Sequence, residues 1–224
     1  MKAMILAAGY GKRLLPLTKD TPKPLLKVGN KTLIERNINN LLESGFSEIV
    51  INVSHLSKLV EGHVKEKFPK NNISFSFEEK PLGTGGGVLK ALNILGSEPF
   101  LLINSDIYHC ISFTNMPKKT EAAHLIGVPN PDHNRNGDFS IKNENMVEVQ
   151  DGLNELTWSG ISLINPIIFN ENVFDDESFN IWKGVLPKYI NNGKVTAHKS
   201  SEFWIDVGTQ DRLKLANTLH NEEN

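Results

Sequence analysis

Strand-like and helix-like segments alternate from residue 1 to residue 106, and this order constrains the fold more than any other feature. Apolar runs of strand length, such as KAMILAA (2–8) and PFLLINSD (99–106), are separated by segments whose apolar residues recur at helical spacing. Continuous apolar runs are typical of parallel strands that are covered on both faces. The order therefore predicts an α/β fold, a Rossmann-like, doubly wound and mostly parallel sheet. Strands are predicted at 2–8, 48–54, 73–77 and 99–106, and helices at 32–45, 56–68 and 84–95.

After Asp106 the alternation weakens, and strand-like pieces are separated by polar turns. This pattern predicts antiparallel additions to the sheet in the C-terminal half. No long linker, repeat or low-complexity tract interrupts the chain, so we expect one domain of residues 1–224 with two halves, 1–110 and 111–224. Further strands are predicted at 122–128, 138–142, 146–150, 156–164, 194–200 and 202–208, and helices at 179–193 and 209–219.

Composition limits the classes of partner. A formal net charge of −2 gives no general electrostatic attraction to nucleic acid or to an anionic membrane, so we expect neither as a partner. Cys110 is the single cysteine, which excludes an intramolecular disulfide and a thiolate metal cluster. No apolar run approaches the roughly 18 residues of a membrane span. The apolar run at the start of the chain is too short for a signal peptide. We therefore expect a cytoplasmic protein that begins near Met1.

The loop after the first strand, LAAGYGKRLLPLTKDTPKPLL (6–26), has the composition of an anion-binding loop. Gly9 and Gly11 let backbone N–H groups approach an anion closely. Arg13 can clamp phosphate oxygens through two hydrogen bonds, and Lys23 can supply a point charge. Loops at the carboxyl ends of parallel strands are where open α/β sheets bind ligands. We therefore interpret the loop as a phosphate-binding segment.

Two familiar glycine loops do not match. A P-loop needs Ser or Thr after its Gly-Lys pair, whereas Arg13 follows Lys12 here. A dinucleotide fingerprint needs a third glycine where this chain has Leu14. The alternative without a ligand is a stiff Gly/Pro-rich turn whose basic side chains are only solvated.

Five blocks of the sequence together resemble the sugar-phosphate nucleotidyltransferases. The glycine loop resembles that family's signature, Gly-x-Gly-x-Arg-Leu-x-Pro-x-Thr followed by Pro-Lys-Pro. The blocks PLGTGGGVLKAL, FLLINSD, WSGI and WIDVGT follow in the family's order, so the resemblance covers nearly the whole chain. It implies the transfer of a nucleotidyl group from a nucleoside triphosphate to a sugar 1-phosphate, with release of pyrophosphate. It also implies a nucleotide-binding half at 1–110 and a sugar-phosphate-binding half at 111–224.

The resemblance implies Mg²⁺ as cofactor, held by Asp106 and Asp206, and catalytic roles for Arg13, Lys23 and Asp106. Mg²⁺ usually takes one or two carboxylates together with phosphate oxygens and water. Without the resemblance, the two aspartates would read as a turn residue and a helix-capping acid. The family commonly has glycine before the first metal aspartate, where this chain has Ser105. The nucleotide-binding residues implied are Ala8, Gly9, Gly11, Lys12, Arg13, Lys23, Gly83, Thr84, Gly85 and Asn104.

Candidate residues for the sugar phosphate are Asp138, Trp158, Ser159 and Gly160. An acid can accept hydrogen bonds from sugar hydroxyls, and an aromatic face can pack on a sugar ring. Asp138 is equally well explained as a turn residue, and Trp158 as a core residue. Many relatives have a Glu-Lys pair in this region whose lysine holds the sugar phosphate, but MVEVQDGLNELTWSG contains no lysine. The cation that binds this phosphate is therefore open.

The nucleotide and the oligomeric state rest on finer resemblances. The compact length, the GTGGG block, the GDF tripeptide and the WIDVGT ending favour the uridylyltransferases of this family, and hence UTP. Thymidylyl or guanylyl transfer to a hexose 1-phosphate is the alternative within the family, and an inactive nucleotide-sugar sensor is the alternative outside enzymes. The chain ends at Asn224, without room for the C-terminal extension of longer relatives, so we expect a monomer or a weak homodimer.

Overall fold

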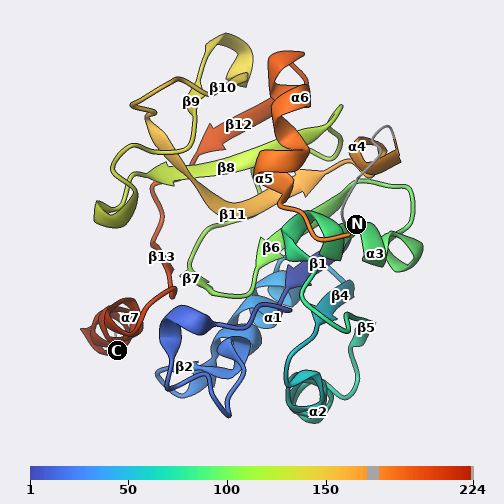
Figure 1. Ribbon diagram of the computed structural model, residues 1–224, viewed down its shortest axis with the longest axis vertical. Coiled ribbons are helices and arrows are strands. Elements are labelled where there is room, and N and C mark those ends of the chain that lie inside the picture. The colour runs from blue at the N-terminus through green and yellow to red at the C-terminus, as the bar shows by residue number, and fades with distance from the viewer. Residues whose placement is uncertain (171–176, 223–224) are drawn as a thin grey trace.

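The computed structural model describes residues 1–170 and 177–222, and a seven-stranded sheet in the order β12–β8–β11–β6–β1–β4–β5 forms its centre (Figure 1). The strands of this sheet are β1 (Lys2–Leu6), β4 (Glu48–Val53), β5 (Asn72–Phe77), β6 (Phe100–Asn104), β8 (Ala123–Pro129), β11 (Leu156–Ile164) and β12 (Val195–Lys199). The helices are α1 (Leu33–Glu43), α2 (Ser57–Lys67), α3 (Gly83–Leu95), α4 (Ile167–Asn170), α5 (Ile181–Gly184), α6 (Leu186–Asn191) and α7 (Gln210–Glu222). Three small antiparallel pairs join β2 (Lys27–Val28) to β3 (Lys31–Thr32), β7 (Ile107–His109) to β13 (Trp204–Asp206), and β9 (Ser140–Ile141) to β10 (Val147–Glu148).

The predicted fold class is confirmed. Within the described sheet only β11 runs against the others, pairing antiparallel with both β6 and β8. β1 pairs in parallel with β4 and β6, and β4 with β5. The edge strand β12 is parallel to β8, so the predicted strand at 194–200 is not one of the antiparallel additions. Those additions are β11 and the small pairs β9–β10 and β7–β13.

One predicted helix is broken in two. The segment 179–193 forms α5 and α6, which are separated at Val185 with φ −122° and ψ −57°. Pro187 lies in the first turn of α6, where its missing N–H costs no helical hydrogen bond. A continuous helix would have lost that hydrogen bond and placed the proline ring against Lys183.

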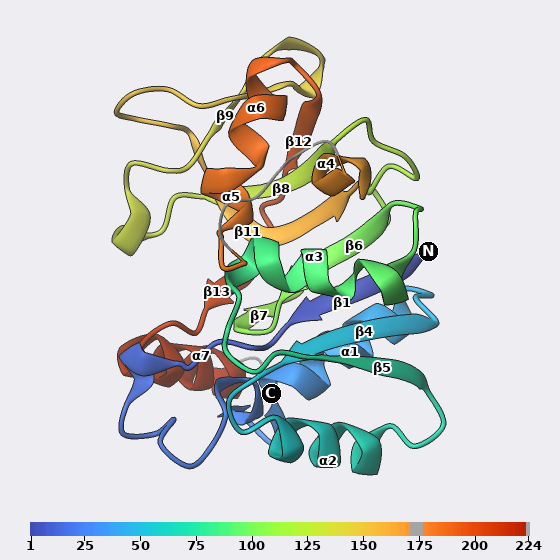
Figure 2. The ribbon, with the colours of Figure 1, turned by 45° about the vertical axis from the view of Figure 1, so that its right-hand side comes forward.

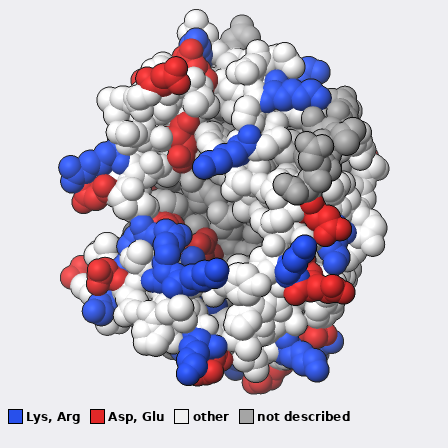
Figure 3. Space-filling view, in the orientation of Figure 1, with Lys and Arg blue, Asp and Glu red and all other residues white. Residues whose placement is uncertain are grey.

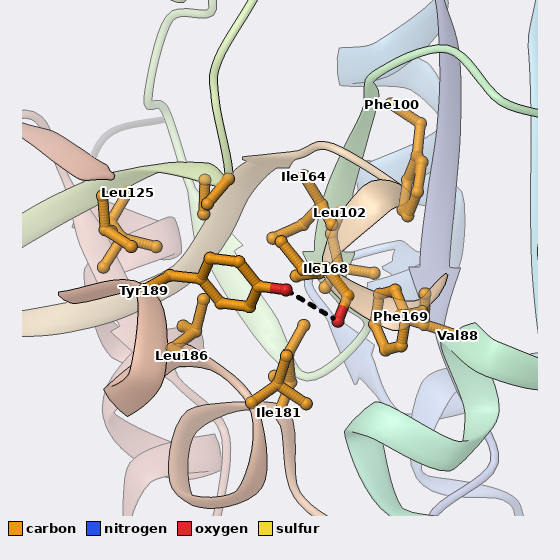
Figure 4. Close-up of a cluster of buried hydrophobic side chains, with 14 of the residues drawn as sticks. Val88, Phe100, Leu102, Leu125, Ile164, Ile168, Phe169, Ile181, Leu186 and Tyr189 are labelled. Atoms are coloured by element: carbon orange, nitrogen blue, oxygen red, sulfur yellow. Dashed lines mark hydrogen bonds between the residues drawn. The ribbon is translucent and has the colours of Figure 1, made fainter. Parts of the chain in front are cut away.

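Apolar side chains cover both faces of the sheet. On one face α1 and α2 bury residues such as Ile38 and Val60 against β1, β4 and β6. On the other face α3, α5 and α6 pack over the cluster of Figure 4, in which the Tyr189 hydroxyl donates to the Ile168 carbonyl at 3.4 Å. Figure 2 shows α3 and α2 on opposite sides of the strands. Among the described residues, no helix is long and apolar enough to cross a membrane.

The direction of winding reverses beside β1. From β1 the chain passes through α1 to β4 and through α2 to β5, and it then returns through α3 to β6 on the other side of β1. The loops that follow β1 and β6 therefore separate at the carboxyl ends of these strands. Open α/β sheets bind their ligands at such a switch point.

Two buried histidines make the fold sensitive to acid. Burial lowers the pKa of His109 from 6.5 to about 4, and the Nδ1 atom of this residue accepts a hydrogen bond from the Ile111 N–H at 3.0 Å. Burial also lowers the pKa of His124 from 6.5 to about 4, with a smaller contribution from the charge of His198. Both side chains are therefore neutral in the folded protein at pH 7.

The free energy of unfolding should fall as pH is lowered from about 6.5 towards about 4. In that window the unfolded chain takes up protons that the folded chain excludes, so protonation favours unfolding. Urea unfolding at pH 7, 6 and 5 measures the slope. His124→Asn should flatten it, whereas His55→Asn, at an exposed position, should not. Equal slopes in all three proteins would contradict this account.

Candidate active site

A cleft of about 340 Å³ opens at the switch point beside the ends of β1 and β6. Figure 3 shows basic side chains along the rim of a central hollow, with acidic atoms behind them. The sequence-predicted residues that line it are Ala8, Gly9, Gly11, Lys12, Arg13, Lys23, Gly83, Thr84, Asn104 and Asp106. The cleft is also lined by Pro24, Asn52, Pro81, Ser105 and Gly208.

The glycine loop is held open by a backbone turn at Gly11. This residue has φ 66°, and a Cβ there would lie 3.0 Å from Thr18 Cγ2. The Thr18 hydroxyl donates to the Gly11 carbonyl at 2.9 Å, and this hydrogen bond stabilises the turn. The next residues form a 3₁₀ turn, Lys12–Leu14, in which Leu14 is buried. Leu14 thus anchors the turn in the core while Arg13 lines the cleft.

A buried chain of hydrogen bonds, which no local sequence pattern reveals, connects the two loops that line the cleft. The Ala7 N–H donates to Asn52 Oδ1 at 2.7 Å, and Asn52 Nδ2 donates to Glu78 Oε1 at 2.7 Å. The second carboxylate oxygen, Glu78 Oε2, accepts from the Leu82 N–H at 2.8 Å. Ala7 is the first residue after β1, and Leu82 is the N-cap of α3, so one network positions both loops. Gly87 makes room for it, since a Cβ there would lie 2.6 Å from Asn52 Nδ2.

Lys23 and Asp106, both predicted to be catalytic, form an ion pair. Lys23 Nζ lies 2.5 Å from Asp106 Oδ2, and the side chains are 12% and 26% exposed. Each partner neutralises the other in a wall of low dielectric constant. A bound phosphate group could replace Asp106 as the partner of Lys23, and a bound cation could replace Lys23 as the partner of Asp106.

β7 and β13 bring Asp106 and Asp206 to adjacent backbone positions. Asp206 stands opposite Ile107, and the Val207 N–H donates to the Asp106 carbonyl at 2.7 Å. The Asp206 carboxylate lies between an imidazole and a guanidinium, with Oδ1 3.0 Å from His133 Nε2 and Oδ2 3.0 Å from an Arg212 nitrogen. It does not line the cleft itself, whereas Gly208, two residues later, does.

The carboxylates of Asp106 and Asp206 suit a divalent cation whose remaining ligands come from the substrate. Asp206 Oδ1 is buried and has no hydrogen-bond donor in good geometry, so it keeps a lone pair for a ligand. Within residues 1–170 and 177–222 no group of three or more His, Cys, Asp or Glu residues is placed to hold a metal. A site of this kind suits a divalent cation that takes few protein ligands and fills its shell with phosphate oxygens and water.

The GTGGG block contacts the start of α5 and the segment before it. The Thr84 hydroxyl accepts a hydrogen bond from the Ile181 N–H at 2.9 Å, although Thr84 also lines the cleft. Gly85 does not line the cleft. Its N–H donates to the Phe179 carbonyl at 2.9 Å, and a Cβ at Gly85 would lie 2.2 Å from the Phe179 ring. Close packing explains this glycine better than nucleotide contact does.

The WSGI block forms an irregularity in β11, at which the register with β8 shifts between Trp158 and Ser162. Gly160 has φ 79°, and a Cβ there would lie 2.5 Å from Asn104 Nδ2, so only glycine brings β11 this close to the end of β6. Trp204 braces the bulge by donating from Nε1 to the Ser159 carbonyl at 2.9 Å. Bulges of this kind often redirect side chains beside active sites.

The predicted sugar-phosphate residues have structural partners of their own. Asp138 Oδ2 accepts from the Trp158 N–H at 2.8 Å, and Asp138 Oδ1 accepts from Asn134 Nδ2 at 3.1 Å. The Trp158 ring stacks on Trp182, with centroids 5.6 Å apart. Neither these two predicted residues nor Ser159 and Gly160 line the 340 Å³ cleft. Their contact with a sugar stays a prediction.

A doubly wound sheet with a cation-lined cleft at its switch point defines a phosphate-binding α/β protein of the nucleotide-binding kind. Residues 2–223 match the nucleotidyl transferase family. An N-acetylmuramate alpha-1-phosphate uridylyltransferase of Neisseria meningitidis serogroup B is 38% identical over 98% of this chain and 98% of that protein. The chain therefore belongs to the nucleotidyl transferase family, and it is a sugar-1-phosphate nucleotidyltransferase.

More distant relatives share the fold. The mannose-1-phosphate guanylyltransferase catalytic subunit beta of Drosophila melanogaster is 31% identical over 92% of this chain, which spans only 59% of that protein. A putative glucose-1-phosphate thymidylyltransferase from Bacillus anthracis has a TM-score of 0.86 at 24% identity, covering 100% of this chain and 96% of that one. HddC from Yersinia pseudotuberculosis, complexed with GMP-PN, has a TM-score of 0.81 at 25% identity, covering 98% and 99%.

Glu78→Gln should lower the free energy of unfolding by about 1–3 kcal/mol and weaken binding of the nucleoside triphosphate. Both ends of the buried chain are N–H donors, so Glu78 must accept at both of its oxygens. Glutamine offers one acceptor and places an NH₂ group against a donor. Urea unfolding and nucleotide titration measure the two effects.

Glu79→Gln, at the exposed neighbouring position, is the matched control and should behave as wild type. Wild-type stability and nucleotide affinity in Glu78→Gln would show that the network does not position the loops.

Proposed function

We propose that the protein transfers UMP from UTP to N-acetylmuramate 1-phosphate, giving UDP-N-acetylmuramate and pyrophosphate in cell-wall recycling. The observation that carries this proposal is the 38% identity, along 98% of both chains, with the enzyme of that name from Neisseria meningitidis. Similarity over the full length of both chains covers the nucleotide-binding and the acceptor half alike. The Drosophila guanylyltransferase above is less similar and extends well beyond the aligned region.

In this reaction an oxygen of the sugar phosphate attacks the α-phosphorus of UTP. One P–O bond forms to the sugar phosphate, and the bond between the α-phosphorus and the bridging oxygen to the β-phosphate breaks. Such a step needs positioning and charge neutralisation more than covalent catalysis. Arg13 and Lys23 line the cleft, where their charges would hold the triphosphate and stabilise the leaving pyrophosphate.

Asp106 and Asp206 would hold Mg²⁺, and the backbone pairing of β7 with β13 keeps them at neighbouring positions. When bound, the ion would neutralise negative charge that develops on the phosphate oxygens. Lys23 is paired with Asp106 in this structure, and binding of the ion to Asp106 would free Lys23 to contact a phosphate oxygen. The GTGGG block would supply backbone groups of Gly83 and Thr84 to the base or ribose.

Two other functions stay open to test. Guanylyl or thymidylyl transfer to a hexose 1-phosphate uses the same phosphate chemistry with other pockets for base and sugar. A sensor that binds nucleotide-sugars without turnover would have no need of the Lys23–Asp106 pair in the cleft. The cytoplasmic location, the monomeric or weakly dimeric state and the one-domain organisation remain predictions from the sequence.

A screen that crosses UTP, dTTP, GTP, CTP and ATP with several sugar 1-phosphates, with and without Mg²⁺, should give the fastest pyrophosphate release with UTP and N-acetylmuramate 1-phosphate. A preference for glucose or mannose 1-phosphate would favour the alternative within the family. Binding without turnover for every pair would favour the sensor.

Asp106→Asn should lower kcat by about 100-fold or more, because a neutral amide is a poor ligand for Mg²⁺ and leaves Lys23 without a counter-charge. Its free energy of unfolding should fall by about 1–3 kcal/mol, because Lys23 loses its counter-charge in a largely buried position, and the variant should remain folded. Asp211→Asn, whose side chain is 95% exposed on α7, serves as the control. A parallel collapse of stability and activity would make Asp106 a structural residue.

A further inference from the structure

The guanidinium of Arg212 is buried beside the predicted metal aspartate, and most of its donors are unsatisfied. Its side chain is 14% exposed, and its Nη2 atom lies 3.0 Å from Asp206 Oδ2. That contact is not aligned for a hydrogen bond, so among the described residues Nε and Nη2 are buried without an acceptor in good geometry. A buried charged group with unused donors gains more from a hydrogen-bonding anion than an exposed one does.

The position of the guanidinium is fixed by Gly208 and by the start of α7. A Cβ at Gly208 would lie 2.0 Å from Arg212 Nη2, so the guanidinium rests directly on this glycine. Gly208 itself lines the nucleotide cleft. Gln210 Nε2 donates to the Leu15 carbonyl at 2.6 Å, which docks the start of α7 on the glycine loop, and the views of Figures 1 and 2 both place α7 beside that loop. Arg212 therefore lies against Gly208 in the wall of the cleft, at the end of β13.

This wall faces the acceptor half of the protein. The second oxygen of Asp206 contacts His133 Nε2, which belongs to the segment between β8 and β9. The triphosphate side of the cleft already has Lys12, Arg13 and Lys23. Arg212 thus lies on the side from which a second phosphate group would approach.

Other basic residues of the acceptor half near the WSGI and GDF blocks are engaged at the surface. Lys142 is 61% exposed and pairs with Glu148. Arg135 is 79% exposed and pairs with Asp132 at 3.0 Å. Neither is held against the cleft, so neither provides the missing cation for the sugar phosphate.

We propose that Arg212 binds the phosphate of the sugar 1-phosphate acceptor, through Nε and Nη2. This inference rests on the proposed function, and it names the group that the absent Glu-Lys pair leaves unassigned. In the structure Asp206 is the counter-charge of Arg212; with substrates bound, Asp206 serves the divalent cation and the acceptor phosphate takes its place at the guanidinium. The planar fork of arginine suits two phosphate oxygens, which lysine cannot match.

Steady-state kinetics of Arg212→Gln test the proposal, with N-acetylmuramate 1-phosphate or the sugar 1-phosphate that wild type uses best in the screen. Its KM for the acceptor should rise about 10- to 100-fold, and its KM for UTP should change by less than about threefold. Calorimetric binding of the same sugar 1-phosphate, in the presence of a non-hydrolysable UTP analogue and Mg²⁺, should weaken by the same factor. Arg212→Lys keeps the charge, so its KM and its affinity for the acceptor should lie between those of wild type and Arg212→Gln. Lys214→Gln, at a position 78% exposed on the same helix, should behave as wild type.

Binding of Mn²⁺, followed by electron paramagnetic resonance, separates a phosphate role from mere support of Asp206. Mn²⁺ affinity that is unchanged in Arg212→Gln and Arg212→Lys supports the proposal. A loss of Mn²⁺ affinity that matches the loss of acceptor affinity would overturn it, as would unchanged acceptor binding or a selective loss of UTP. If Arg212→Gln does not fold, Arg212→Lys decides by the same criteria. Wild-type enzyme that turns over no sugar 1-phosphate would refute the proposed function instead, and the calorimetric comparison would still test Arg212.

Discussion

The cleft depends on the parallel hydrogen bonding that holds β1 between β4 and β6. Because all three strands run the same way, their carboxyl ends meet at one edge, and the segments after them must leave from that edge. The glycine loop follows β1, Asn52 is near the end of β4, and Asp106 comes directly after β6. An antiparallel neighbour at either position would have sent one of these groups to the opposite end of the molecule.

Lys23, Asp106 and Asp206 each have an ionic partner within the protein. Lys23 is paired with Asp106, and Asp206 lies between His133 and Arg212. In a wall of low dielectric constant an unpaired charge would be costly, and such pairing offsets part of that cost. The same groups are those that a polyphosphate and a divalent cation would use, so binding exchanges one set of ionic partners for another. The divalent cation and the released cationic side chains would offset part of the negative charge that two polyanions bring in.

The sequence was most informative where the pattern is local. Alternating apolar runs predicted the doubly wound sheet, and the glycine loop predicted the residues that line the cleft. It was least informative where residues far apart in the chain meet. Asn52 and Glu78 look like ordinary strand-end residues, and no spacing links Arg212 to the acceptor half. The break before Pro187 could have been predicted, because proline is unfavourable inside a helix. Tertiary contacts alone reveal why Gly85 and Gly160 are glycines.

The hydrogen-bond chain through Asn52 and Glu78 also constrains how the family can diverge. Its two outer groups are main-chain N–H donors, which every residue except proline supplies. The side chains between them must therefore present acceptors outward and meet each other as donor and acceptor. A homologue that changes one of these two positions would have to change the other at the same time or recruit a water molecule. Across aligned relatives, positions 52 and 78 are thus expected to covary as a pair.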